Sequence, residues 1–260
     1  PVPEPAPEPP EPPELSADPF ELCTADAELP DASLRAVQAR PPQRQRGDCV
    51  FYEHPIHHHR HLSALCRARP HANLARALLH GEASDHLEII QGPPGTGKTS
   101  ALVGRVMHVA GRVLLCAPTN VGAANLYERC VAAGYGPECS LVLPPDRIPP
   151  GTAVQSNDPA RRIVCSTISS RAGPVLDHHA FATVLVDEAA QCMEAWIWTL
   201  MRPEVERAVL AGDVHQLPAI TSESGRALAH ARSLMGRLAS DLEYENVTVL
   251  TVQNRMAPEI

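Results

Sequence analysis

Short apolar runs alternate with amphipathic segments along the chain from about residue 70 onward. The apolar runs, rich in β-branched residues, predict strands at 87–91, 113–117, 163–166, 184–186, 208–211 and 247–252. Apolar positions at helical spacing predict helices at 74–79, 99–110, 123–133, 192–201 and 225–238. The Pro- and Gly-rich stretch 134–161 indicates a long loop or a small excursion. This alternation predicts an α/β fold with a mostly parallel sheet flanked by helices.

The first third of the chain has a different character. Residues 1–14 repeat Pro and Glu, and nine acidic residues without Lys or Arg fall within 1–34. We therefore expect 1–47 to be a disordered acidic, Pro-rich tail and linker, with one short helix near 31–39. Residues 48–85 form a basic lead-in segment that contains His and Cys, and 86–252 form the folded domain.

Composition narrows the class of protein. The 260 residues are 44% hydrophobic, enough for a sizeable core, and contain no apolar run near 18 residues. We expect no membrane partner, and we see no secretory signal. The eight scattered cysteines favour a reducing, intracellular compartment, cytoplasmic or nuclear. Because the chain begins with Pro1, we expect a fragment or a processed product.

A glycine-rich segment at the end of the first strand predicts a phosphate-binding loop. Residues 92–99 fit the pattern G-x-x-x-x-G-K-[ST], between a predicted strand and a predicted helix. Lys98 is the only lysine in the chain, which otherwise uses Arg. A compact ammonium group suits the β- and γ-phosphates, and the hydroxyl of Thr99 suits Mg²⁺. The expected nucleotide contacts are Gly92, Pro93, Pro94, Gly95, Thr96, Gly97, Lys98, Thr99 and Ser100.

Two further strand ends carry polar residues. Asp187 and Glu188 follow the strand at 184–186, where Asp187 is expected to hold the metal with Thr99 and Glu188 to activate water. Gln216 lies in the segment GDVHQLP after the next strand and is expected to sense the γ-phosphate. An Asx turn made by Asp213 is the structural alternative for that segment.

Taken together, the ordered motifs of residues 86–260 resemble a superfamily 1 helicase. The branch is that of the nonsense-mediated-decay helicase (Upf-like), whose DEAxQ box is similar to Asp187–Gln191. The stretches LCAPTN, VCST and VQNRMAP resemble three further motifs of that family. The resemblance implies RecA-like motor domains, of which 86–252 is the first and 253–260 the start of a second. It also implies ATP and Mg²⁺ as cofactors, and ATP hydrolysis coupled to 5′ to 3′ movement along single-stranded RNA or DNA.

The resemblance also implies roles for individual residues. Lys98, Asp187, Glu188, Gln216 and Arg255 would be catalytic, with Arg255 reaching the γ-phosphate from the second motor domain. The strand path would be lined by Pro118, Thr119, Asn120, Ser166 and Thr167. Asn254 stands where the family usually has a tyrosine, and the later motifs are absent. We therefore expect the chain to bind nucleotide but to hydrolyse it weakly on its own.

Other features and readings stay open at this stage. Histidines and cysteines between 49 and 71 could form a zinc module, but they lack a paired C-x-x-C, so we do not expect zinc. Trp196 and Trp198 are expected to pack in the core.

Two alternatives to the helicase motor stay open, a P-loop ATPase that acts on protein and a non-catalytic adaptor that binds ATP or RNA. In the second of these, the Pro/Glu-rich tail would recruit protein partners.

Overall fold

The computed structural model of the chain describes residues 70–227 and 230–253. Outside the described residues lie the predicted tail and linker at 1–47, its short helix near 31–39, and the lead-in segment up to residue 69. Asn254 and Arg255 also lie outside them. In the part of the chain that the structure describes, no helix is both long and apolar enough to cross a membrane.

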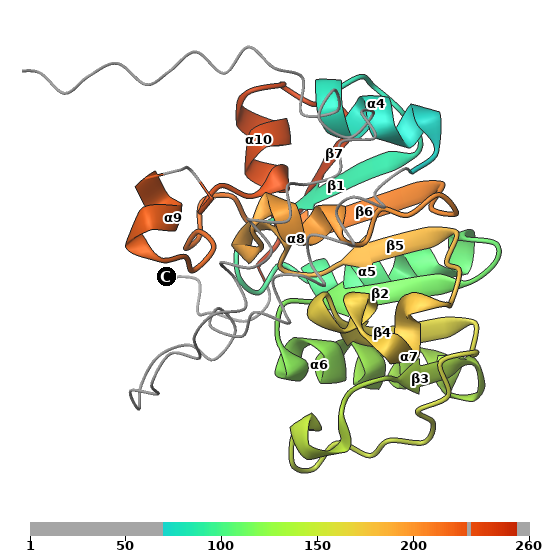
Figure 1. Ribbon diagram of the computed structural model, residues 1–260. Coiled ribbons are helices and arrows are strands. Elements are labelled where there is room, and N and C mark those ends of the chain that lie inside the picture. Colours follow the sequence, from blue (N-terminus) through green and yellow to red (C-terminus); the bar gives the residue numbers. More distant parts are fainter. Residues whose placement is uncertain (1–69, 228–229, 254–260) are drawn as a thin grey trace, which may run out of the picture. The chain divides into compact units, whose positions relative to one another are not determined.

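One sheet organises the described residues. Its strands lie in the order β3-β4-β2-β5-β6-β1-β7, and every pairing is parallel (Figure 1). The strands are β1 Leu87–Gln91, β2 Val113–Ala117, β3 Cys139–Leu141, β4 Ile163–Thr167, β5 Thr183–Val186, β6 Arg207–Gly212 and β7 Val247–Val249. Because all the strands run the same way, their carboxyl ends meet at one edge, where ligands bind in open α/β sheets.

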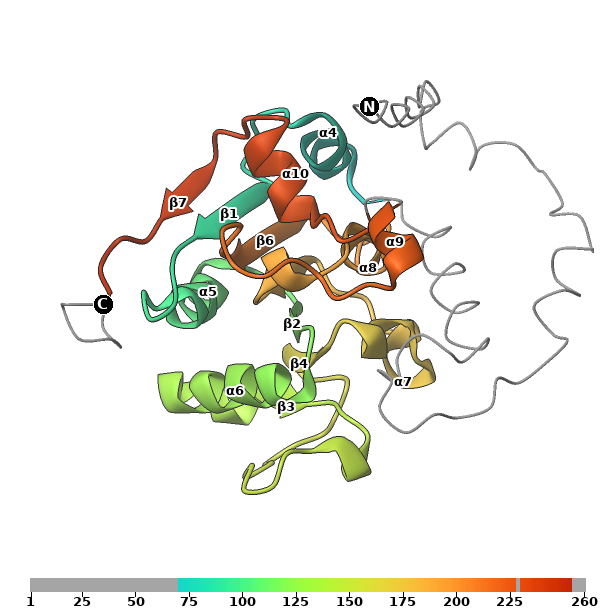
Figure 2. The same ribbon diagram turned by 90° about the vertical axis from the view of Figure 1, so that its left-hand side faces the viewer.

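Helices cover both faces of the sheet. Side chains of each strand alternate between two buried cores, so that Ile89 enters one core and Ile90 the other. The first core is covered by α4 Ala72–His80, α7 Pro174–Asp177, α8 Glu194–Trp198 and α10 Leu234–Ser240. The second is covered by α5 Lys98–Arg105 and α6 Asn120–Cys130. Figure 2 shows the two groups of helices on opposite sides of the strands.

The sequence of the central strands explains this arrangement. β2 reads VLLCA and β5 reads TVLV, and every residue of both strands is buried. Continuous apolar runs of this kind are typical of parallel strands covered on both faces. Cys116 on β2 and Cys165 on β4 are buried in the cores, as the sequence predicts.

Two predicted helices are wrong in their extent. The stretch 225–238 contains two helices, α9 Glu223–Ala227 and α10. Ser233 is extended (φ −90°, ψ 153°) and its hydroxyl accepts a hydrogen bond from Gly236 N at 3.0 Å, which starts α10 afresh. The helix predicted at 192–201 is only α8, because Cys192 and Met193 before it have extended ψ values of 134° and 141°.

Smaller differences concern the ends of elements. The segment predicted as the helix 99–110 leaves α-helical geometry after Arg105 and continues as the 3₁₀ turn Val106–His108. The last strand is shorter than predicted, and ends at Val249. Within 134–161, where a loop or small excursion is predicted, the three residues of β3 pair with β4 at the edge of the sheet.

The helices of the first core are tied together by one arginine. Arg237 on α10 donates three hydrogen bonds to Glu194 on α8 and two more to the carbonyl oxygens of Leu78 and Leu79 on α4. Those carbonyls belong to the last turn of α4, which has no helical partners for them. Trp196 and Trp198 are partly buried against the same core, which confirms the predicted packing role.

Candidate nucleotide site

The segment between β1 and α5 forms a tight loop at the carboxyl edge of the sheet. Gly95 and Gly97 have φ values of +82° and +87°, a region that other residues enter only with strain. A Cβ on Gly92 would lie 2.5 Å from Thr96 Oγ1 and 3.0 Å from Leu250 Cβ. The glycines of the motif therefore serve two needs, backbone conformation at 95 and 97 and close packing at 92.

Lys98 is the first residue of α5, and its side chain is turned back over the loop. Its Nζ donates to Gly92 O at 2.8 Å and to Pro93 O at 3.3 Å, and the residue is only 6% exposed. The ammonium group is thus held where loop N–H groups and the positive end of α5 also converge. A phosphate oxygen could replace the two carbonyl partners without moving the helix.

Thr99 and Asp187 connect the phosphate loop with the end of β5. Thr99 Oγ1 donates to Asp187 Oδ2 at 2.8 Å, which joins the start of α5 to the residue that follows β5. Burial raises the pKa of Asp187, although hydrogen bonds from Thr99 and from Glu188 N act against this. A hydroxyl and a carboxylate are oxygen donors of the kind that Mg²⁺ prefers, so this pair fits the ion.

Glu188 has a strained backbone. Its φ of 53° and ψ of 37° place a non-glycine residue in the left-handed region. Gln191 supports this turn, since its backbone N donates to Glu188 O at 3.0 Å and its side-chain Nε2 to Glu188 Oε2 at 3.1 Å. Strain of this type clusters at functional sites, where the surrounding structure fixes it.

The end of β6 contributes a third carboxylate. Asp213 accepts hydrogen bonds from Gln91 Nε2 at 2.8 Å, from His215 N at 3.1 Å and from Gln216 Nε2 at 3.0 Å. Burial alone would raise the pKa of Asp213, but these bonds and the nearby Lys98 ammonium lower it. The Asx turn expected as the structural alternative is therefore present, and Gln216 takes part in the same network.

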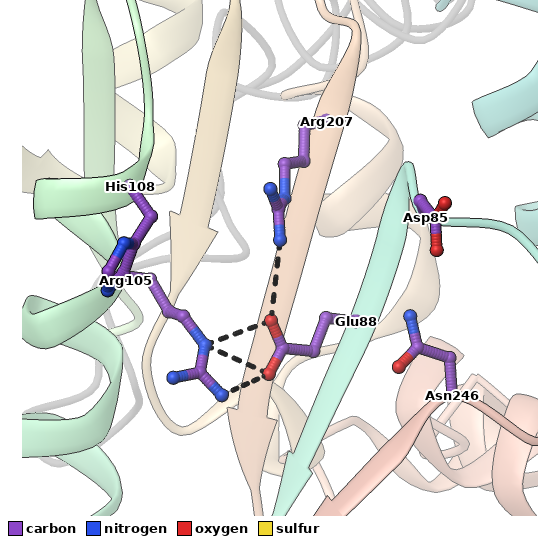
Figure 3. A pocket seen from close by; sticks show the side chains of 6 residues that line it. All are labelled: Asp85, Glu88, Arg105, His108, Arg207 and Asn246. Carbon is purple, nitrogen blue, oxygen red and sulfur yellow. Dashed lines mark hydrogen bonds and ion pairs between the residues drawn. The ribbon is translucent and has the colours of Figure 1, made fainter.

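A second polar pocket lies away from this site. It has a volume of about 470 Å³ and is lined by Asp85, Glu88, Arg105, His108, Arg207 and Asn246. Figure 3 shows that Arg105 and Arg207 both point to Glu88, with N–O distances of 2.5 Å and 3.6 Å. Burial acts to raise the pKa of Glu88, but the hydrogen bonds from Arg105 lower it on balance. Since both guanidinium groups are already paired, we assign this pocket a structural role.

Comparisons with known proteins identify the family and the fold. A family model described as an AAA domain matches residues 71–160 and 159–224. The chain belongs to this AAA domain family. Mouse DNA-binding protein SMUBP-2 is 29% identical over 67% of the chain and 24% of its own length. The ATP-dependent helicase upf1 of Schizosaccharomyces pombe is 26% identical over 67% of the chain and 25% of its own length.

These relatives confirm the resemblance that the motifs suggest, to an Upf1-like motor domain of superfamily 1 helicases. An arterivirus nonstructural protein 10 helicase shares the fold, with a TM-score of 0.50, 21% identity and coverage of 72% of this chain and 39% of that one. The chain spans about a quarter of the length of the curated relatives it matches.

The AAA domain brings some of the predicted strand-contact residues to the same edge and buries others. Pro118 and Thr119 connect β2 to α6, Asn120 is the first residue of α6, and Thr119 is exposed. Its Oγ1 accepts from Gly122 N at 3.0 Å and caps α6. Ser166 on β4 is fully buried and donates to Val142 O at 2.6 Å, and Thr167 is 5% exposed. Contact of these residues with nucleic acid stays a prediction.

The sequence analysis does not assign a role to two side chains of the site, those of Gln91 and Arg129. Gln91 closes the network at Asp213 and also accepts from Val214 N at 3.3 Å. Arg129 on α6 donates to Ser100 Oγ at 2.9 Å and so links α6 to the start of α5. For Gln91 a signal existed, because a polar residue that ends an otherwise apolar strand just before a phosphate loop points to the ligand edge.

Proposed function

We propose that the chain is the ATP-binding half of a nucleic-acid helicase, which couples ATP hydrolysis to movement along a single strand. Members of AAA-type families use ATP with a divalent metal. The observation that carries the proposal is the 2.8 Å hydrogen bond between Thr99 and Asp187. It unites the phosphate loop and the acidic strand end at one edge of the sheet, which ATP and Mg²⁺ both require.

The proposed roles follow from the positions of the groups. Lys98 neutralises the β- and γ-phosphates, and Thr99 and Asp187 hold Mg²⁺. When bound, Mg²⁺ neutralises the charge that develops on the phosphate oxygens. Glu188, held beside Asp187 by its strained backbone, accepts the proton of the attacking water. Gln216 donates a hydrogen bond to Asp213 and so belongs to the network at that carboxylate. In this proposal its side chain senses the γ-phosphate and transmits its presence to the rest of the domain.

The strand and the second motor domain complete the proposal. Pro118, Thr119 and Asn120 lie at the carboxyl end of β2, where small polar groups can contact a nucleic-acid backbone without reading its sequence. Residues 86–252 are the first motor domain, and 253–260 begin the second, from which Arg255 reaches the γ-phosphate. A nucleic-acid substrate agrees with the name of the mouse relative, a DNA-binding protein. The proposed direction of movement is 5′ to 3′.

The single lysine allows a sharp test of nucleotide binding. An amine-reactive reagent has only one lysine side chain to modify, that of Lys98, and peptide mapping separates it from the terminal amine. We expect MgATP to protect Lys98 from modification. We also expect Lys98→Ala to weaken ATP binding at least about 10-fold, the loss of one charge-assisted contact. Lys98 modified at the same rate with and without MgATP would contradict the proposal.

Turnover then separates the helicase motor from the two alternatives. ATPase activity is measured with and without single-stranded RNA and single-stranded DNA, on this chain and on a version that includes a second motor domain. We expect weak turnover by the 260-residue chain and strand-stimulated turnover by the longer version, both abolished by Lys98→Ala. ATP binding without turnover in either version would favour the adaptor. Turnover that no strand stimulates would favour an ATPase acting on protein.

A further inference from the structure

Three cysteines meet on the face of the sheet that α6 covers. Cys130 is the last residue of α6, Cys139 the first residue of β3, and Cys165 the middle residue of β4. Their sulfur atoms all lie within 4.8 Å of one another, and Cys139 Sγ is 3.8 Å from Cys165 Sγ. All three side chains are fully buried. The nucleotide site uses none of them.

The spacing of the sulfur atoms matches that of metal-bound thiolates. A metal–sulfur bond of about 2.3 Å gives neighbouring sulfurs in a tetrahedral or trigonal site a separation of roughly 3.8–4.0 Å. The Cys139–Cys165 distance of 3.8 Å already has this value. Small rotamer changes of Cys130 would bring the third sulfur to the same separation.

The surroundings select the kind of ion. Among the described residues, no His, Asp, Glu or fourth Cys joins this cluster, and its neighbours in the core are apolar. Zinc in structural sites takes four ligands, so a dry three-sulfur site suits it poorly. Soft sulfur ligands select the cuprous ion.

The proposed entry path for an ion lies where α6 ends. The chain leaves Cys130 through the short π-helical turn Val131–Tyr135, in which Gly134 has a φ of +93°. Ala132 and Ala133 in this turn are exposed. Opening of the turn would uncover Cys130 without unfolding the sheet, because local opening concentrates in segments with few buried contacts.

We propose that Cys130, Cys139 and Cys165 form a binding site for one cuprous ion in three-sulfur coordination. Because cysteine binds metal as the thiolate, the ion displaces the three thiol protons to solvent, and it joins α6 and β3 to β4. Since α6 begins at Asn120, itself one of the predicted strand-contact residues, occupancy would stiffen the element that positions Thr119. The site shares no residue with the nucleotide site, so binding of the ion can be tested separately from the proposed function.

The test is an anaerobic titration of the 260-residue chain with Cu(I) against a chromophoric Cu(I) chelator. Cys23, Cys49 and Cys66 are replaced by Ser in the background variant, because they lie outside the described residues and could bind the ion themselves. We expect one Cu(I) per chain, and a loss of affinity of at least about 10-fold in Cys139→Ala and in Cys165→Ala. The matched controls are Cys116→Ala and Cys192→Ala, two buried cysteines outside the cluster, which should keep the ion.

X-ray absorption of the background variant reports the coordination of copper directly. This part of the test therefore does not depend on whether the Cys→Ala variants fold. Three sulfur neighbours per copper are expected, and Cu(I) should raise Tm because the site exists only in the folded chain. No Cu(I) uptake by the folded background variant would overturn the proposal. Two sulfur neighbours, a preference for zinc, or an equal loss in Cys116→Ala would do so as well.

Discussion

At the scale of single residues, the nucleotide site keeps the carboxylate of Asp187 in a place where burial disfavours its charge. The bond from Thr99 compensates only part of this cost. A bound Mg²⁺ would supply the rest, since a cation nearby stabilises the ionised form. Under the proposed function, the site therefore carries a destabilising group in order to hold Mg²⁺, a common trade between stability and activity.

We expect Asp187→Asn to raise the stability of the nucleotide-free chain at pH 7, by about 1 kcal/mol, while abolishing Mg²⁺-dependent ATP binding. The pKa of Asp187 is raised in the folded state, so its carboxyl group favours folding when protonated. This contribution to the free energy of unfolding is present below the ordinary pKa of a carboxyl group. It is lost as pH rises through the raised pKa of the folded state. Thermal unfolding from pH 4 to 8 measures it, and the substitution should flatten this part of the profile.

The exposed Asp146 offers a matched control for this substitution. Asp146→Asn should leave Tm at pH 7 within error, because an exposed carboxylate loses little solvation on folding. If Asp187→Asn lowered Tm at pH 7, the interpretation of Asp187 as a destabilising buried charge would be wrong.

The residues of the site divide into those that local sequence reveals and those that it does not. Lys98 and Thr99 follow from a contiguous loop pattern, and Asp187 from an acidic residue after an apolar strand. The contact between Gln91 and Asp213 spans 122 positions in sequence. It depends on β1 and β6 being neighbours in the sheet, and no local pattern contains that information.

At the scale of elements, α6 links the strand-contact segment to the interior of the domain. Thr119 at its N-terminus is exposed, and its hydroxyl both caps the helix and lies at the carboxyl edge of the sheet. Ser233 caps α10 in the same way, with a bond to Gly236 N of 3.0 Å, but lies in the first core's layer of helices. A comparison of substitutions at the two caps therefore distinguishes the stabilising effect of an N-cap from contact with nucleic acid.

Thr119→Ala and Ser233→Ala should each cost about 1 kcal/mol of unfolding free energy, because each removes an N-cap. Only Thr119→Ala should also weaken binding to a labelled single-stranded oligonucleotide, by roughly 3–10-fold, the loss of one hydrogen bond. Urea denaturation and fluorescence anisotropy measure the two effects. Equal oligonucleotide affinity in both variants would remove Thr119 from the strand path.

The sequence predicts elements well where the apolar runs are long and poorly where conformation depends on partners. β2 and β5 are evident from continuous apolar residues. The three residues of β3 show no alternation and form a strand only because β4 offers an edge. The division between α9 and α10 depends on Ser233, whose capping role is hidden inside a stretch with helical spacing.

At the scale of the whole domain, the helices of the first core are joined by polar contacts as well as by apolar packing. Arg237 is 19% exposed in its side chain and Glu194 27%, so their ion pair is shielded from much of the solvent. The same guanidinium satisfies two carbonyls of α4. One side chain therefore fixes α4, α8 and α10 relative to one another.

We expect Arg237→Ala to lower the unfolding free energy by about 2–3 kcal/mol, because it leaves Glu194 and the end of α4 without a partly buried charged donor. Arg76→Ala is the matched control. Arg76 pairs with Glu82 on the surface, with side chains 60% and 50% exposed, and its loss should cost less than about 1 kcal/mol. Similar losses in the two variants, measured in urea, would show that the contact across three helices adds nothing.

The strand order of the sheet is the part of the whole fold that the sequence leaves undetermined. Alternation of strands and helices predicts a parallel sheet, but it does not say that β1 lies between β6 and β7. That order results from the packing of all the crossover connections together. It also decides which strand ends become neighbours, and so which side chains can share one ligand.

The place of β7 beside β1 has a consequence for whatever follows it in the chain. Leu250 N donates to Gln91 O at 2.8 Å, so the backbone is fastened next to the phosphate loop just before Gln253. A domain joined to the chain after Gln253 would thus be held by a tether of a few residues, from Thr251 to Gln253. A tether of this length gives an attached domain an effective concentration in the millimolar range. Contacts too weak to join two separate molecules would then suffice to close such a domain over the nucleotide.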